Sequence, residues 1–257
     1  MRRSLLSLAV AACVALAAGP AGAITFGHVD GNRHPSVGSL LGKTKRGRFY
    51  QLCSGSLVAP TVFLTAAHCV QGSNPKRFWV TFDPVLGRGM TVVHGVGHYD
   101  HRAYTSGESK PHDIAVIVLD RPVDRPTVEL PPIGLLDRLK DEHQLHGALV
   151  TAVGYGAVRE TMQGGFQSLR GNRKRRYVEQ HVRTVLKQWL VLSMNPRTGS
   201  GGTCYGDSGG PHFLGGVDSN LEVSLTVTGD APCKSTDTTF RLDTRAAQGF
   251  LARYVDL

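Results

Sequence analysis

One stretch near the end of the chain carries residues suited to nucleophilic chemistry. It reads Cys204-Tyr205-Gly206-Asp207-Ser208-Gly209-Gly210-Pro211. Glycines on both sides of Ser208 let the backbone turn sharply and let another molecule approach the hydroxyl closely. The same frame can direct main-chain N–H groups at a developing negative charge. A serine hydroxyl is a weak nucleophile until a base takes its proton, so the rest of the chain must supply a base and a group that orients it.

The candidate base is His68, in the segment Thr65-Ala66-Ala67-His68-Cys69. This segment follows an apolar run and ends in a candidate half-cystine, which would hold the imidazole on a braced turn. The candidate orienting group is Asp113, which precedes the apolar run Ile114 to Leu119 and would therefore lie at a buried strand end. In such a triad Ser208 attacks a carbonyl, His68 carries the proton, and Asp113 fixes the tautomer and stabilises the imidazolium.

The elements that must position these residues read as short strands. Runs rich in β-branched and apolar residues, bounded by turn residues, predict strands, and many short strands favour an all-β sandwich or barrel. The predicted strands are 56–58, 61–64, 78–82, 90–93, 114–119, 149–153, 182–192 and 221–228. The proline-rich segment 120–136 predicts a connector between two halves.

Two further segments are predicted to be a loop and a helix. The segment 159–176 is glycine-rich and then strongly basic, and it predicts an exposed loop; polyanion binding or processing at its basic end is the alternative. Near the C-terminus, apolar residues recur at helical spacing after Asp243, which can cap. They predict a short helix over about 244–255 that packs on the second half.

The N-terminus has the features of a secretory signal peptide. A cationic start, an apolar run and the small residues Ala21-Gly22-Ala23 predict a signal over residues 1–23, removed by cleavage before Ile24. A twin-arginine signal and a lipidated Cys13 are weaker alternatives. The formal charge of the 257-residue chain is +9, and net charge alone identifies no partner.

Four cysteines follow the predicted signal: Cys53, Cys69, Cys204 and Cys233. An even count in an oxidising compartment implies two disulfides, and the sequence allows three pairings. Proximity favours Cys53–Cys69 and Cys204–Cys233. The first of these would contribute about 3 kcal/mol in the chain-entropy model of disulfide stabilisation.

The order of the candidate catalytic residues argues against an α/β-hydrolase fold. The segment 206–210 also fits G-x-S-x-G, the nucleophile elbow of α/β-hydrolases, in which the acid and the histidine follow the serine. After Ser208 the only histidine is His212, which is too near in sequence to act as the base. The chain also lacks the alternating helices of an α/β sheet, so this fold is rejected.

Three motifs together give the chain a resemblance to trypsin-like serine endopeptidases of the secreted bacterial type. They are the segments 65–69, 112–119 and 204–211, in the order histidine, aspartate, serine. The resemblance implies two antiparallel six-stranded β-barrels with the active site in the cleft between them and a short C-terminal helix. The first barrel would span 24–135 with His68 and Asp113, and the second would span 136–257 with Ser208.

The resemblance also assigns roles around the nucleophile. The N–H groups of Gly206 and Ser208 would form an oxyanion hole. The ammonium of Ile24, exposed by signal cleavage, would pair with Asp207, although the start Ile24-Thr25-Phe26-Gly27 departs from the usual Ile-Val-Gly-Gly.

The specificity pocket implied by the resemblance carries no charge. It would include Gly202 where trypsin-like members place an acid, together with Thr203, Gly229 and Thr238. A neutral pocket favours apolar or small side chains. Asp230, beside Gly229, is interpreted as an exposed surface acid, and attraction of a basic group at the rim is the alternative.

The remaining expectations concern ligands and partners. His94, His98 and His101 lack a recognised metal-ligand spacing, so we expect no metal and no cofactor. We expect protein or peptide substrates, protein inhibitors as further partners, no nucleic acid, no membrane after signal removal, and a monomer. The alternative function is a catalytically silent, cationic binding protein.

Overall fold

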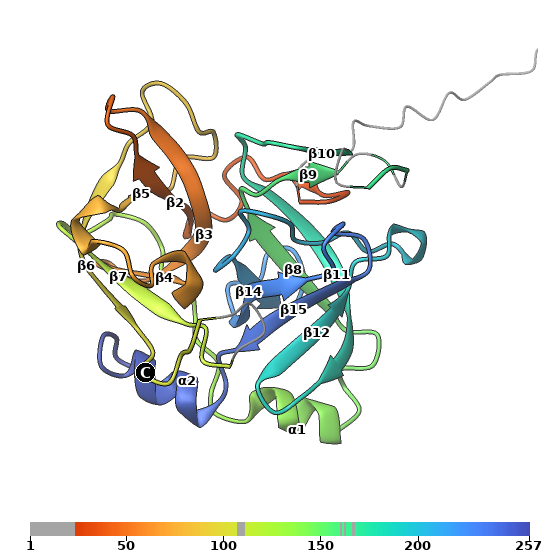
Figure 1. Cartoon of the computed structure of the whole chain (residues 1–257). Coiled ribbons are helices and arrows are strands. Elements are labelled where there is room, and N and C mark those ends of the chain that lie inside the picture. The colour runs from red at the N-terminus through yellow and green to blue at the C-terminus, as the bar shows by residue number, and fades with distance from the viewer. Residues whose placement is uncertain (1–23, 107–110, 160, 162, 166–167) are drawn as a thin grey trace, which may run out of the picture.

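Two barrels of short strands make up the molecule. The computed structural model describes residues 24–106, 111–159, 161, 163–165 and 168–257. The predicted signal peptide lies outside these residues. The strands form two six-stranded antiparallel barrels that lie side by side (Figure 1). This confirms the predicted all-β fold with two barrels.

The first barrel closes around an apolar interior. Its strands follow the spatial order β2 (Val37–Lys43), β3 (Phe49–Ala59), β4 (Val62–Thr65), β7 (Ala115–Leu119), β6 (Val93–Asp100) and β5 (Trp79–Thr81), and β5 pairs again with β2. The interior residues include Leu40, Leu57, Phe63, Val80 and Ile117, each fully buried.

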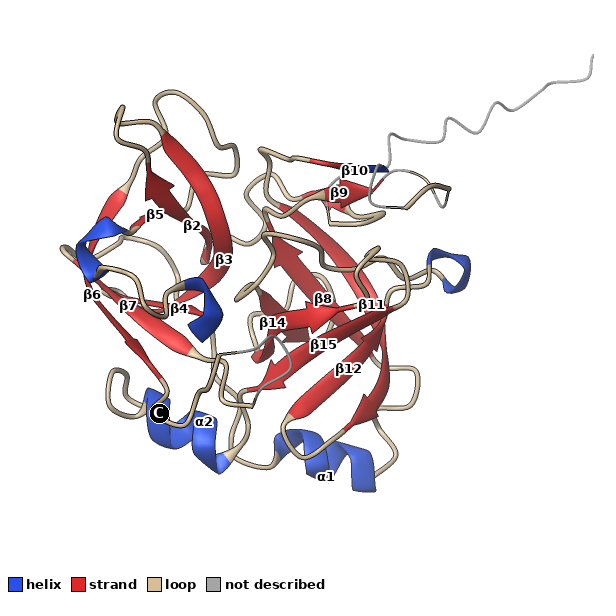
Figure 2. Ribbon diagram, viewed as in Figure 1, coloured by secondary structure: helices blue, strands red, loops and turns tan. Residues whose placement is uncertain are grey.

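The second barrel closes through β8, which pairs with both β11 and β13. Its strands are β8 (Leu149–Gly154), β11 (Arg176–Val185), β12 (Trp189–Ser193), β15 (Thr236–Arg241), β14 (Glu222–Gly229) and β13 (Pro211–Leu214). The short strand β1 (His28–Val29) joins this sheet beside β11. The N-terminal segment thus contacts the second barrel before the chain enters the first. A separate ribbon, β9 (Val158–Arg159) with β10 (Leu169–Arg170), lies at the upper edge of the second barrel (Figure 2).

Several predicted strands differ from the structure in their limits. The segment 182–192 is a hairpin rather than one strand, since β11 ends at Val185 and β12 begins at Trp189. The predicted strand 90–93 is wrong except at Val93, where β6 begins. No strand was predicted at β2, β13 or β15, whose glycine, proline and polar residues weaken the local signal.

The chain has two short α-helices, one between the two barrels and one after the second barrel. Helix α1 (Leu135–Asp141) was not predicted, and Asp243 caps it by accepting the N–H of Leu136 at 2.8 Å. Helix α2 (Arg245–Leu251) is shorter than the predicted 244–255, and its N-cap is Thr244. Among the described residues, neither helix is long enough or apolar enough to cross a membrane.

Helix α2 packs on both barrels, since its buried residues share one apolar cluster with Phe240 and Leu242 of the second half and with Val116 of the first. It lies below the first barrel in Figure 2. The Phe250 ring is 5.7 Å from that of His101, and the Tyr254 ring stacks on Tyr99 at 5.4 Å. The helix therefore returns the end of the chain to the first half and ties the two barrels together.

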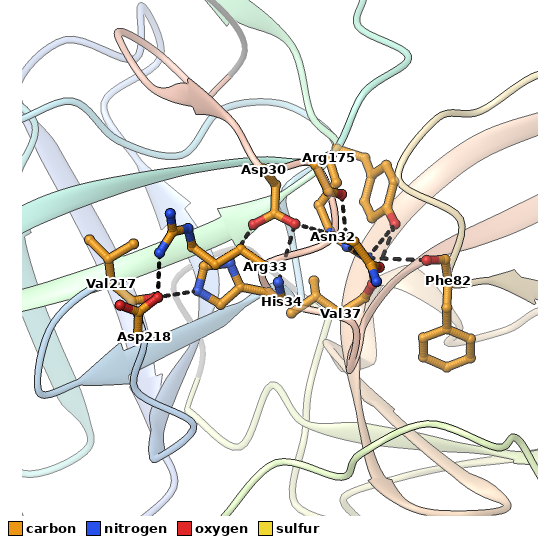
Figure 3. A network of polar contacts seen from close by, with 11 residues as sticks. Asp30, Asn32, Arg33, His34, Val37, Phe82, Arg175, Val217 and Asp218 are labelled. Atoms are coloured by element: carbon orange, nitrogen blue, oxygen red, sulfur yellow. Dashed lines mark hydrogen bonds and ion pairs between the residues drawn. The ribbon is translucent and has the colours of Figure 1, made fainter.

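The predicted exposed loop 159–176 carries two fully buried arginines, Arg159 and Arg175, and the prediction is wrong at both. Figure 3 shows Arg175 in a polar network, where its Nε donates to Asp30 Oδ2 at 2.7 Å and its Nη1 donates to the carbonyl of Val37. Burial alone would raise the pKa of Asp30, but hydrogen bonds from His34 and the charge of Arg175 hold that pKa below its usual value.

Candidate active site

His68 and Asp113 meet because two neighbouring strands place them at the same end. His68 lies in the 3-10 turn after β4, and Asp113 lies just before β7. In the antiparallel register Thr65 is opposite Ala115, so the end of β4 meets the start of β7. A residue just past one strand and a residue just before the other are thereby brought into contact.

The contact between them uses both carboxylate oxygens. His68 Nδ1 bonds Asp113 Oδ2 at 2.7 Å, and the His68 main-chain N–H donates to Asp113 Oδ1 at 2.9 Å. The Asp113 side chain is fully buried, whereas that of His68 is 25% exposed. Because the carboxylate can only accept, Nδ1 carries the proton and Nε2 is left as the basic nitrogen.

The disulfide Cys53–Cys69 braces this turn on β3, and Cys204–Cys233 braces the segment before Ser208. Both bonds confirm the pairing that proximity favoured. Each joins a loop that carries a candidate site residue to a neighbouring element, so the two loops are fixed covalently.

The Ser208 loop belongs to the second barrel but is held by the first. Ser54 on β3 donates its N–H to the Ser208 carbonyl at 2.9 Å. The carbonyl of Gly206 accepts from Gln51 Nε2 and from Ser54 Oγ, both at 3.0 Å. These bonds place the loop at the seam between the barrels, where His68 also lies.

A pocket of about 160 Å³ contains both His68 and Ser208 in its wall. The rest of the wall comes from the second barrel: Thr203, Cys204, Tyr205, Thr226, Val227, Thr228, Gly229, Asp230, Ala231 and Cys233. Two of the four predicted pocket residues, Thr203 and Gly229, are in this wall. Gly202 and Thr238 are not among the described residues that form it.

Gly202 is outside the pocket wall, in a tightly packed position. Its backbone pairs with Thr25 in both directions. A Cβ atom on Gly202 would lie 2.3 Å from Met194 Cγ and 2.8 Å from Gln180 Nε2. Any larger residue at position 202 would therefore have to displace the side chain of Met194 or Gln180.

The strand register identifies an acid that the sequence reasoning missed. Asp237, not Thr238, is opposite Gly229. Asp237 is fully buried inside the second barrel, where its Oδ2 accepts from Gln180 Nε2 at 3.1 Å and lies 3.2 Å from His212 Nε2. The bulge in β14 between Thr226 and Thr228 shifts this register, and local sequence gave no sign of it.

The predicted oxyanion donors lie where the backbone is unusual. Gly206 has a φ of +96°, a conformation that favours glycine. A Cβ atom there would also lie 3.0 Å from Gln51 Nε2 and 3.2 Å from Gly156 Cα. The N–H groups of Gly206 and Ser208 donate to no other described residue, so both can serve a ligand.

Asp207 is fully buried and accepts two main-chain hydrogen bonds, from Gly156 at 2.7 Å and from Cys204 at 2.9 Å. Burial raises the pKa of its carboxyl to about 7, although these hydrogen bonds oppose the rise. Within the described ranges no cationic side chain pairs with it. The predicted partner Ile24 is fully buried against Ala152 and Val178.

The pattern of the family described as Trypsin matches residues 26–247. The chain belongs to the trypsin family. It is 29% identical to Trypsin zeta of Drosophila erecta over 63% of this chain and 60% of that protein. It is 30% identical to a trypsin-like protease of Streptomyces glaucescens over 63% of this chain and 58% of that protein. The matches thus span about three fifths of these two relatives of the trypsin family.

The histidines weighed as metal ligands are engaged separately in this trypsin-family chain. His94 Nε2 lies 3.1 Å from the Lys76 carbonyl, and His98 Nε2 lies 3.0 Å from the Ser73 carbonyl. His101 stacks on His112 at 4.5 Å between ring centroids. No group of three ligand atoms includes them among the described residues.

Proposed function

We propose that this chain is a serine endopeptidase that hydrolyses peptide bonds through an acyl-enzyme, with His68, Asp113 and Ser208 as its triad. The observation that carries the proposal is the His68–Asp113 pair, bonded at 2.7 Å, in one pocket with Ser208. Membership of the trypsin family supports the same reaction.

In the proposed reaction His68 first accepts a proton and then donates it, once in each half of the cycle. Ser208 Oγ attacks the carbonyl carbon of the scissile bond while its proton passes to His68 Nε2. Asp113 stabilises the imidazolium, and the N–H groups of Gly206 and Ser208 stabilise the oxyanion. The C–N bond then breaks as His68 gives its proton to the leaving amine. Water repeats the sequence on the acyl-enzyme and releases the acid.

The proposed activation step is signal cleavage before Ile24. It would free an ammonium group for Asp207, a buried carboxyl whose pKa is raised to about 7 by its burial. Pairing with a cation favours the charged carboxylate. Removal of either partner alone would leave a buried charge and cost roughly 3–5 kcal/mol. Sequencing the N-terminus of the secreted, active protein tests this step, and an active form that begins elsewhere would contradict it.

The proposed specificity is for apolar or small side chains. The pocket volume of about 160 Å³ and the glycine at position 202, where trypsin-like members place an acid, support this preference. Asp230 lines the pocket, but its carboxylate accepts the N–H groups of Lys234, Ser235 and Thr236 and so holds its own loop. A cleavage profile dominated by arginine or lysine would contradict this specificity.

The predicted signal peptide suggests where the proposed enzyme acts. We propose that the protein is secreted and monomeric, acts on proteins or peptides, and is a target for protein inhibitors. The alternative, a silent cationic binding protein, would keep the fold without using Ser208.

Labelling with a fluorophosphonate probe separates these two functions. We expect the wild-type protein to be labelled at Ser208, Ser208→Ala to be unlabelled, and Asp113→Asn to be labelled roughly 10³–10⁴-fold more slowly. Circular dichroism of all three proteins controls for folding. A folded wild-type protein that resists the probe would contradict the proposed activity and favour the binding protein.

A further inference from the structure

Two grooves flank the hairpin that joins β2 to β3. The first has a volume of about 740 Å³, and its charged lining residues are Arg48, Arg88 and Arg173. The second has a volume of about 540 Å³ and is lined by Lys43, Lys45 and Arg77. No aspartate or glutamate is among the described residues that line either groove. We call these six cations the basic face.

The cations of the first groove are available to a ligand. Arg48, Arg88 and Arg173 are exposed, and none forms an ion pair with another described residue. Elsewhere on the surface Arg33 and Arg121 do pair with aspartates. Unpaired like charges around one groove create a positive potential that concentrates anions.

The groove is also a fixed and partly apolar surface. The Leu86 N–H donates to the Arg173 carbonyl at 2.7 Å, which joins its two loop segments. Apolar and aromatic side chains line it between the cations: Leu41, Phe49, Tyr50, Leu86 and Met90. Such a lining suits a peptide, which presents apolar groups between its charges, better than a uniformly sulfated polysaccharide.

Both grooves begin beside the proposed catalytic residues. Gln51 lines the first groove and donates to the Gly206 carbonyl in the Ser208 loop. Cys69, which follows His68, lines the second groove. The specificity pocket, in contrast, is built from the second barrel apart from His68. The grooves therefore approach Ser208 from the first-barrel side.

The location of the grooves determines which part of a bound substrate would reach them. In the proposed reaction His68 gives its proton to the leaving amine, so the leaving segment lies on the side of the first barrel. The acyl segment occupies the second-barrel pocket. The chain beyond the scissile bond then runs toward the β2–β3 hairpin.

We infer that the basic face binds acidic residues on the leaving side of the scissile bond. The substrate class is a protein or peptide with an acidic segment C-terminal to the cleaved bond. The inference rests on the proposed function for its orientation and adds a second specificity site to it.

The first experiment measures cleavage of quenched fluorescent peptides that share one acyl side and carry an acidic, neutral or basic leaving side. We expect the wild-type protein to cleave the acidic series with a kcat/KM about three- to tenfold higher than the neutral series at low salt, as expected for two exposed ion pairs. High salt should remove the difference. Arg88→Glu with Arg173→Glu should reverse the preference. Lys187→Glu, an exposed charge reversal beyond the end of β11, should keep it.

The second experiment does not depend on catalysis. Anisotropy of labelled acidic and neutral peptides is measured on Ser208→Ala, with and without Arg88→Glu and Arg173→Glu. Tighter binding of the acidic peptide that disappears in the charge-reversed variant supports the inference. Equal binding of the two peptides overturns it, as does binding of dextran sulfate without any preference for the acidic peptide. Fluorophosphonate labelling of the wild-type protein reports separately on the proposed activity.

Discussion

The carboxyl of Glu222 is buried at the seam between the two barrels and should govern how stability depends on pH. Its Oε2 accepts from Ser56 Oγ on β3 at 2.5 Å, and its Oε1 has no hydrogen-bond partner among the described residues. Burial raises the pKa of this carboxyl to about 8, and the Ser56 hydrogen bond only partly opposes the rise. Glu222 is therefore largely protonated in the native protein at neutral pH.

The sign of the effect follows from proton binding. Between the ordinary value of 4.5 and about 8, the native state holds a proton that the unfolded state has lost. The free energy of unfolding therefore falls as pH rises through this window, by up to about 1.4 kcal/mol per pH unit. The contribution of Glu222 to the free energy of unfolding is fully present below pH 4.5, and roughly 3–5 kcal/mol of it has been lost by pH 8.

Glu222→Gln removes the titration and keeps the shape of the side chain. We expect the variant to be more stable than the parent by roughly 3–5 kcal/mol at pH 8 and to differ little at pH 4. Urea unfolding followed by tryptophan fluorescence measures this, with both proteins in a Ser208→Ala background to prevent self-digestion. Asp207, whose pKa is also raised, contributes equally to both proteins and cancels in the difference.

The matched control is Glu142→Gln, at the end of α1, where the side chain is exposed beside Arg138. It should leave the pH profile of the parent unchanged. Parallel profiles for Glu222→Gln and its parent between pH 4 and 8 would refute the reasoning. They would mean that the pKa of Glu222 in the native protein is the same as in the unfolded chain.

Two further predictions concern the packing around Gly202 and the buried ion pair between Arg175 and Asp30. Gly202→Asp should lower the melting temperature without creating cleavage after arginine or lysine, because its Cβ would meet Met194 Cγ at 2.3 Å; efficient cleavage at basic residues would contradict this. Arg175→Met should destabilise the protein by roughly 3–5 kcal/mol because it leaves Asp30 charged and buried, and adding Asp30→Asn should restore part of that loss in urea unfolding. Additive losses in the double variant would argue against the pair.

The candidate site was accessible to sequence reasoning because its signals are local. The glycines around Ser208 and the half-cystine beside His68 lie within a few residues of the groups they position. Strand β15 shows the opposite case. No strand was predicted there because its residues are mostly polar, yet Thr239 is fully buried and donates to the Leu190 carbonyl at 2.9 Å. A buried polar strand is recognised only when its partners on neighbouring strands are known.

The basic run Arg173-Lys174-Arg175-Arg176 shows why charge patterns mislead. Its interpretation as a solvated loop fails at Arg175, whose partner Asp30 is 145 positions away in the sequence. Because Arg175 is fixed inside by Asp30 and two main-chain carbonyls, the backbone on either side of it is fixed as well. Arg173, two residues earlier, is thereby held on the first groove while its side chain stays exposed. A buried ion pair thus orders the loop that displays an unpaired charge. Loss of the Arg175–Asp30 pair should consequently weaken the preference for acidic leaving segments even in a protein that remains folded.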